Sequence, residues 1–220
     1  MPATLSHRYG WNNAVAPQSC GIVGAAVLQA LRDLGARRVL DLGAGNGALC
    51  AQMHAAGFEV VGVERDAEGV QIARTSHPSI PFHCFGIGDD ATLLITSIGK
   101  FDVVVSTEVI EHLYSPHELP LCAQRFLAPG GHLLLTTPYH GYVKNLALSI
   151  FGHWDVHHAP LWHGGHIKFW SRRTLTQLLA EGGFRAVAFR GIGRLPFLWK
   201  SMLLTARLLT ESRADALPGN

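Results

Sequence analysis

Residues 39–49, VLDLGAGNGAL, decide how the rest of the chain is interpreted. An apolar run that contains Asp41 leads without a break into a loop with glycines at positions 43, 45 and 47. Glycines at the junction of a strand and a helix permit a tight turn and let a ligand approach the backbone closely. The stretch therefore predicts a buried strand, a ligand-binding loop and the start of a helix.

Short apolar runs alternate with helical patterns along much of the chain. The runs are rich in valine and leucine on both faces, which is typical of buried parallel strands. Asn46 and Asp66 stand where the N-caps of two intervening helices are expected. The strands are predicted at 37–43, 59–64, 80–86, 101–107 and 131–137, with helices over 46–57 and 66–77 and a crossover over 115–131.

The C-terminal part of the chain ends the sheet differently. A helix is predicted over 171–184, with Ser171 as its N-cap, and strands at 185–192 and 198–208 follow with only GRLP between them. Two strands joined without a helix must pair antiparallel. The sequence therefore predicts an α/β fold with a doubly wound, mostly parallel seven-stranded sheet, Rossmann-like, that ends in an antiparallel β-hairpin.

The length of 220 residues fits a single domain. It is expected over 1–212, with an N-terminal cap at 1–35, a lid inserted at 138–166 and a frayed tail at 213–220. The four cysteines form no CxxC pair, and no segment reaches the ~18 apolar residues of a membrane span. These features favour a cytoplasmic protein with reduced thiols.

Charge is unevenly distributed along the chain. Residues 1–165 carry 9 basic and 13 acidic side chains, whereas residues 166–220 carry 9 and 3. A basic segment is most often a solvated face, and an anionic surface or nucleic acid is the alternative. The charge pattern therefore does not identify a partner by itself.

A second acid supports a nucleotide ligand. Glu64 ends the second predicted strand, 21 residues after Gly43, where a carboxylate can accept hydrogen bonds from both ribose hydroxyls. The segment GAGNGA also satisfies the dinucleotide fingerprint, so NAD is an alternative. Asp41 argues against a diphosphate beside the loop and for the ammonium of an amino-acid moiety.

These motifs resemble those of the class I S-adenosylmethionine-dependent methyltransferases. The first motif of that family is similar to VLDLGAGNGAL, the second ends in an acid as VVGVERD does, and LAPGGHLLLTTP resembles the turn into the fifth strand. The resemblance extends over residues 37–210 and includes the terminal hairpin. It implies S-adenosylmethionine as the cofactor.

The resemblance also assigns cofactor contacts by position. It implies that Asp41 lies under the methionine part, that Glu64 holds the ribose and that Arg65 flanks the adenine. An acid after the third strand contacts the adenine amine, and Asp89 is taken for this role with Asp90 as the alternative. The implied set is Asp41, Gly43, Ala44, Gly45, Asn46, Glu64, Arg65 and Asp89.

Residues 107–113, TEVIEHL, bring polar groups to the end of the buried run FDVVVS. In a helical turn, Glu108, Glu111 and His112 would stand on one face. Two close carboxylates repel one another unless a proton or a cation lies between them, and two oxygens with an imidazole suit Mg²⁺ or Mn²⁺. The alternative is a helix start whose acids favour the helix dipole.

The segment EVIEH resembles the E-x-x-E-H segment of the ubiquinone-biosynthesis O-methyltransferases and of the plant-type small-RNA 2′-O-methyltransferases. In the RNA group a further histidine, before the last long helix, completes a metal site. His166 is matched to that position, with His157, His158 and His163 as alternatives. The implied metal ligands are Glu108, Glu111, His112 and His166.

The predicted activity is O-methylation of a small or lipid-linked acceptor with adjacent, catechol-like hydroxyls. A divalent cation would chelate both oxygens, lower the pKa of one hydroxyl and direct it at the methyl carbon. Glu108 and His140 are the candidate catalytic residues. Segment 142–154 is apolar enough to contact a membrane surface, and Tyr9 and Trp11 are expected to close over the cofactor.

Three rival interpretations remain open. One is methylation of RNA, although nucleic acid is not the favoured partner because only the tail is basic. Another is a metal-independent methyltransferase in which Glu108 or a histidine is simply the base. The third is a non-catalytic module that binds the cofactor. The oligomeric state is not specified by the sequence.

Overall fold

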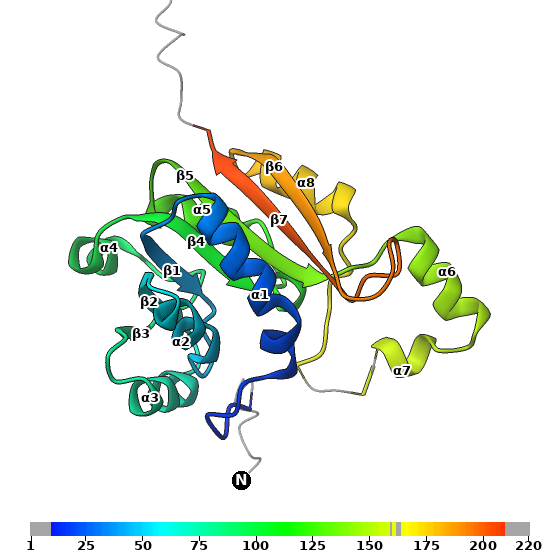
Figure 1. The fold of residues 1–220 in the computed structure, drawn as a ribbon, viewed down its shortest axis with the longest axis horizontal. Coiled ribbons are helices and arrows are strands. Elements are labelled where there is room, and N and C mark those ends of the chain that lie inside the picture. The colour runs from blue at the N-terminus through cyan, green and yellow to red at the C-terminus, as the bar shows by residue number, and fades with distance from the viewer. Residues whose placement is uncertain (1–9, 159, 162–163, 210–220) are drawn as a thin grey trace, which may run out of the picture.

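The computed structural model describes residues 10–158, 160–161 and 164–209. Seven strands form one sheet in the order β3-β2-β1-β4-β5-β7-β6 (Figure 1). β7 is antiparallel to both β5 and β6, and every other pair is parallel. The predicted fold class is confirmed. The strands are β1 Arg38–Leu42, β2 Glu59–Glu64, β3 Phe82–Cys84, β4 Phe101–Thr107, β5 Leu127–Pro138, β6 Phe184–Ile192 and β7 Ser201–Leu208.

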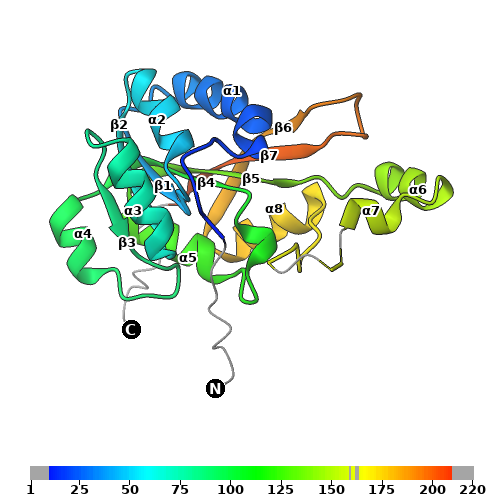
Figure 2. The ribbon, with the colours of Figure 1, turned by 90° about the horizontal axis from the view of Figure 1, so that it is seen from below.

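Helices cover both faces of the sheet. Figure 2 shows α1 and α2 on one side and α5 and α8 on the other. Two apolar clusters fill the spaces between these helices and the sheet, and each contains fully buried strand residues such as Val105 and Leu133. The helices are α1 Gln18–Asp33, α2 Ala48–Ala55, α3 Ala67–Ser76, α4 Thr92–Ile98, α5 Glu118–Phe126, α6 Tyr142–Ile150, α7 Trp154–His158 and α8 Arg172–Glu181, with a 3₁₀ turn, η1, over Ile110–His112.

Two of the three predicted N-caps are confirmed. Asp66 accepts a hydrogen bond from the amide of Glu68, and Ser171 forms a reciprocal capping box with Thr174. The prediction for Asn46 was wrong, because α2 begins after Gly47, which adopts a left-handed φ of 81°. The Asn46 Oδ1 still accepts from the Ala48 amide at 3.3 Å. Its amide nitrogen donates to the carbonyls of Asn13 and Val15 and so holds the chain that precedes α1.

Two boundaries differ from those predicted. The crossover helix α5 ends at Phe126 rather than near residue 131, and β5 begins immediately at Leu127. The pairing of β4 with β5 shifts register between Phe101 and Val103, which lets the early part of β5 join the sheet. Helix α4 was not predicted, because its seven residues, TLLITSI, show no helical periodicity and include several β-branched side chains.

Parallel strands bring their carboxyl ends to one edge of the sheet, so the loops after β1, β2 and β4 lie together there. The amides of Gly43 and Ala44 both donate to the carbonyl of Val63, which ties the glycine loop to the end of β2. The polar residues that follow β4 lie beside this loop, since a Cβ on Gly43 would come within 2.5 Å of Val109. Within the described ranges, no helix is long and apolar enough to cross a membrane.

Candidate active site

A cavity of about 1780 Å³ lies at the carboxyl edge of the sheet. The loops after β1, β2, β3 and β4 form one part of its wall, and segment 164–167 and the start of β7 form another. This is the position at which doubly wound sheets bind their ligands. The predicted cofactor residues that line it are Asp41, Gly43, Ala44, Gly45, Asn46, Glu64 and Arg65.

Asp41 presents a buried carboxylate beneath the glycine loop. Its side chain is 1% exposed, and its Oδ2 accepts a hydrogen bond from Cys50 Sγ at 3.1 Å. Its Oδ1 has no hydrogen-bond partner in the described structure, and burial raises the pKa of this carboxyl to about 7. A buried oxygen without a partner suits a cationic ligand, so Asp41 fits the ammonium of S-adenosylmethionine.

Glu64, the last residue of β2, binds the glycine loop through its carboxylate. Its Oε2 accepts from the Gly45 amide at 2.9 Å, and its Oε1 accepts from the Asp66 amide at 2.8 Å. Burial raises the pKa of the Glu64 carboxyl. Each carboxylate oxygen retains a second lone pair, so the group can still accept from ribose hydroxyls.

Trp11 packs over the same loop. A Cβ built on Gly45, whose φ is 55°, would come within 2.4 Å of the Trp11 indole, and a Cβ on Gly69 within 2.9 Å. Any side chain at Gly45 would therefore displace the tryptophan. Trp11 lines the cavity, at the position expected of a residue that closes over the cofactor; Tyr9, its neighbour in the N-terminal cap, lies outside the described residues.

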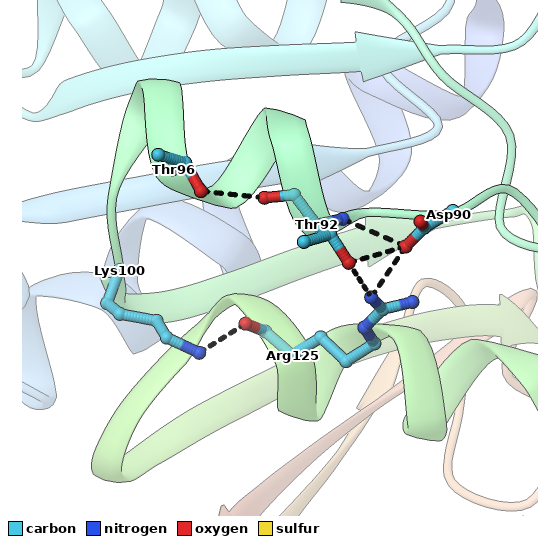
Figure 3. Close-up of polar contacts among 5 residues, drawn as sticks. All are labelled: Asp90, Thr92, Thr96, Lys100 and Arg125. Atoms are coloured by element: carbon cyan, nitrogen blue, oxygen red, sulfur yellow. Dashed lines mark hydrogen bonds and ion pairs between the residues drawn. The ribbon is translucent and has the colours of Figure 1, made fainter.

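The two candidate acids after β3 have structural partners instead. Asp89 does not line the cavity, and its Oδ2 accepts from the Gly86 amide at 2.7 Å. Asp90 accepts from the amide and hydroxyl of Thr92 at the start of α4, and Arg125 from α5 donates to the same oxygen (Figure 3). Both carboxylates therefore stabilise the turn that precedes α4.

The polar segment after β4 does not begin with a helical turn. Glu108 has a left-handed φ of 53°, and the 3₁₀ turn η1 starts two residues later. Glu108, Glu111 and His112 consequently do not share one helix face. Glu108 Oε1 accepts from Thr136 Oγ1 at 2.9 Å and from Ser201 Oγ at 2.8 Å, so its carboxylate is held by β5 and β7.

Three of the four predicted metal ligands come together. One potential ligand atom from each of Glu111, His112 and His166 lies within 4.8 Å of the others, and Glu108 is not part of the group. Backbone hydrogen bonds explain the convergence: the amides of Ile167 and Lys168 both donate to the carbonyl of Glu111. These bonds bring a segment more than fifty residues away against η1.

The Glu111 carboxylate has one satisfied oxygen and one without a partner. Oε2 accepts from Thr137 Oγ1 at 3.0 Å, whereas Oε1 is buried, has no hydrogen-bond partner in the described structure and lies 4.0 Å from His166 Nε2. His112 Nδ1 lies 3.3 Å from the carbonyl oxygen of Gly165, a contact that orients the ring. One carboxylate and two imidazoles form a donor set that fits a divalent transition-metal cation, of which Mn²⁺ is one.

The electrostatics of this group also suit a cation. Burial, followed by the charge of Glu108, raises the pKa of Glu111 well above its ordinary range. Burial lowers the pKa of His112, and burial together with the neighbouring His112 lowers the pKa of His166 to about 4. Both imidazoles are therefore neutral near pH 7, the form that binds metal.

The other predicted histidines have different outcomes. His140 is 7% exposed and does not line the cavity; its ring packs on His158 and Phe169 at centroid distances of 5.5 and 5.0 Å. Burial lowers its pKa to about 3, so it remains neutral. His163, an alternative metal ligand, lies outside the described residues, whereas His157 and His158 line the cavity.

Sequence reasoning missed several polar residues of the site. Thr136, Thr137 and Ser201 hold the two glutamates, yet they occupy strands whose pattern indicated only burial. Lys144 was treated as part of an apolar lid helix, although its ammonium donates to the Tyr139 carbonyl at 2.8 Å and lines the cavity. A lysine within an apolar helical segment was the only available signal.

The sheet order, the glycine loop and the two acids beneath it define a class I S-adenosylmethionine-dependent methyltransferase. The chain belongs to the family described as "Methyltransferase domain", whose model matches residues 22–188. This assignment confirms that the chain is a methyltransferase, as the resemblance implied, and excludes the pyridine-nucleotide alternative.

Similar sequences and structures agree with this assignment. The chain is 28% identical over 180 residues to the ubiquinone biosynthesis O-methyltransferase of Cereibacter sphaeroides, and the alignment covers 81% of this chain and 72% of the relative. It is 31% identical over 165 residues to the enzyme of the same name from Ruegeria sp., which covers 74% and 66%. The magnesium protoporphyrin IX methyltransferase of Synechocystis PCC 6803, solved with bound SAH, has the same fold at 18% identity and a TM-score of 0.64, with 85% and 82% of the chains covered.

Proposed function

We propose that this methyltransferase transfers the methyl group to a hydroxyl oxygen of a small or lipid-linked acceptor that carries a second, adjacent hydroxyl. Two similar enzymes are named ubiquinone biosynthesis O-methyltransferases, which supports oxygen as the acceptor atom. The observation that carries the proposal is the unpartnered, buried Oε1 of Glu111 beside His166. A divalent cation held by Glu111, His112 and His166 would satisfy that oxygen.

The chain's own residues hold the methyl donor. Asp41 pairs with the ammonium, Glu64 accepts from the ribose hydroxyls, and Arg65 borders the adenine end of the cavity. S-adenosylmethionine supplies an activated methyl group on a sulfonium, so the protein needs to position an acceptor oxygen and receive one proton. Asp89 faces its own loop, so it is not included in this set.

A divalent cation at the Glu111 group would lower the pKa of a coordinated hydroxyl and fix two neighbouring oxygens. Glu108 lines the same cavity and is held by Thr136 and Ser201, and burial raises its pKa. A carboxylate with a raised pKa is suited to general-base work near neutral pH. We therefore assign proton removal to Glu108 rather than to His140.

The lid adds apolar surface that suits a lipid-linked acceptor. Helix α6 and the residues after it expose large apolar side chains, which would contact the tail of an acceptor or a membrane surface. The figures place α6 and α7 at one end of the molecule (Figures 1 and 2). The exposed side chains are Tyr142, Val143, Leu146, Ile150, Phe151 and Trp154.

The test is methyl transfer from labelled S-adenosylmethionine to catechols, prenylated phenols and short RNAs. Each reaction is run with Mg²⁺, with Mn²⁺ and with a chelator, for the wild-type chain, Glu111→Gln and the exposed control Glu181→Gln. We expect catechol methylation that chelation abolishes and that Glu111→Gln reduces at least a hundredfold, with the control unchanged. Activity that survives both treatments would identify a metal-independent enzyme.

The remaining alternatives give different results in the same assay. Methylation of RNA in preference to catechols would replace the proposed acceptor, and its binding should then weaken steeply with salt. Cofactor binding without transfer to any acceptor would identify a non-catalytic module.

A further inference from the structure

A second, smaller cavity lies outside the methyl-transfer site. Its volume is about 180 Å³, and it lies between α6 and the loop that joins β6 to β7. Both segments project from the same end of the molecule (Figure 1). A cavity of about 150 Å³ accommodates benzene in another protein, so this one has room for a ring or a short alkyl chain. Its lining residues are Lys144, Ala147, Leu148, Phe151, His153, Arg194 and Leu198.

The two cavities meet at a pair of cations. Lys144 and Arg194 are the only residues of the described ranges that line both of them. Ala147, Leu148, Phe151 and Leu198 give the small cavity an apolar wall, so the two positive charges stand at its polar end. A ligand that extended from the methyl-transfer site into the small cavity would therefore lie beside both cations.

The charges of these two cations are not neutralised by an ion pair in the part of the chain that the structure describes. The Lys144 side chain is 3% exposed, and its ammonium donates to a carbonyl rather than to an acid. Burial lowers the Lys144 pKa to about 8, and repulsion from Arg194 contributes in the same direction more strongly than attraction from Glu108 opposes it.

Like charges brought together at an apolar wall favour an anion between them. The backbone geometry indicates that Arg194 is held there at a cost, because it adopts a left-handed φ of 54°. Arginine and lysine both donate strong hydrogen bonds to carboxylates. We propose that Lys144 and Arg194 bind a carboxylate of the methyl acceptor, whose apolar part enters the small cavity.

This inference rests on the proposed function, because it places the carboxylate at the acceptor end of that same site. It narrows the acceptor to an amphipathic acid. The carboxylate would lie between the cations, the reacting hydroxyl would point toward Glu108, and the apolar group would contact Leu148 and Phe151.

The test uses octanoate as a probe, because it has no catechol hydroxyl and so can bind without being methylated. Binding of octanoate and of octanamide is measured by calorimetry at pH 7, where Lys144 remains mostly protonated. The samples are the wild-type chain, Arg194→Gln and the exposed control Arg190→Gln, which lies on β6 and lines neither cavity. Arg194→Gln is chosen because Arg194 is exposed, whereas a change at the buried Lys144 risks the fold.

We expect octanoate to bind at least tenfold more tightly than octanamide. In Arg194→Gln the ratio of the two affinities should fall by about tenfold or more. Shortening the chain to butanoate should weaken binding about fourfold for each methylene that the cavity buries. Equal binding of acid and amide, no saturable octanoate binding, or an unchanged preference in Arg194→Gln would overturn the inference.

Binding of S-adenosylmethionine to the same samples separates this inference from the proposed function. If all three chains bind the methyl donor and methylate catechols while octanoate fails, only the acid-binding proposal is lost. If catechol methylation fails while octanoate binds at Arg194, the acceptor class is wrong and the anion site remains.

Discussion

At the scale of single residues, the site depends on buried polar groups whose partners lie far away in the sequence. Asp41 and Glu111 are buried and Glu108 is half-buried, and burial raises the pKa of all three. An ionised group in such a place costs stability unless a ligand or hydrogen bonds satisfy it. These acids therefore lower the stability of the unliganded chain and raise its affinity for a ligand that satisfies them.

The stability cost can be measured at Asp41. Its folded-state pKa of about 7 lies above its unfolded value near 4, so it contributes stability below pH 4 that is lost as the pH rises to 7. We expect Asp41→Asn to raise the melting temperature of the unliganded chain at pH 8 and to weaken S-adenosylmethionine binding at least tenfold. The control is Asp33→Asn, an exposed position on α1.

Thermal unfolding at pH 5 and pH 8, with calorimetry of cofactor binding, checks this prediction. Cofactor affinity of the wild-type chain should rise as the pH increases through 7, because binding favours the ionised carboxylate. A pH-independent affinity, or a variant that binds as well as the wild-type chain, would contradict the role of Asp41.

Glu108 gives a second prediction at this scale. As the proposed base it must be ionised, so the rate should fall as the pH drops through its raised pKa. Glu108→Gln keeps the hydrogen-bonding geometry with Thr136 and Ser201 and should lower kcat by 10²–10⁴-fold with little change in KM. Stopped-flow or steady-state kinetics against pH would measure both the pH dependence and the loss of kcat. A variant that retains its kcat would show that another residue is the base.

At the scale of elements, regular strands and helix caps were the predictable part of the fold. Val-rich runs are buried on both faces in a parallel sheet, and Ser171 caps α8 through a local motif that spans four residues. Helix α4 and the left-handed Glu108 carry no such local signal. The backbone at Glu108 is fixed by a bond from its amide to the Thr136 carbonyl, which is a contact between strands.

The cap of α8 can be tested directly. Ser171→Ala removes the bond from the Thr174 amide to the Ser171 hydroxyl, although the backbone amide of residue 171 can still donate to Thr174 Oγ1. The loss should cost about 1 kcal/mol, or about 2–4 °C in melting temperature. Ser149→Ala, at an exposed position inside α6, should change stability by less than about 0.5 kcal/mol. Differential scanning calorimetry compares the two, and equal effects would show that the capping box contributes nothing specific.

At the scale of the whole molecule, the class of enzyme could be predicted but the assembly of its acceptor site could not. The glycine loop and its acids lie within 26 residues, from Val39 to Glu64, so their spacing alone identifies the cofactor end. The acceptor end instead combines η1, β5, β7, α6 and the segment before α8. Only the folded topology brings Glu111 and His166 together, which is why His166 was taken from a resemblance, with three other histidines as alternatives.

The central claim is that Glu111, His112 and His166 bind a divalent cation at the acceptor end of the cavity. Pulsed electron paramagnetic resonance of the chain with Mn²⁺ tests it, because nitrogen ligands couple to the metal spin. We predict one bound Mn²⁺ per chain with nitrogen coupling from two histidines, lost in Glu111→Gln and reduced in His166→Ala, and unchanged in Glu181→Gln. Mn²⁺ that does not bind, or that binds without nitrogen coupling, would contradict the account.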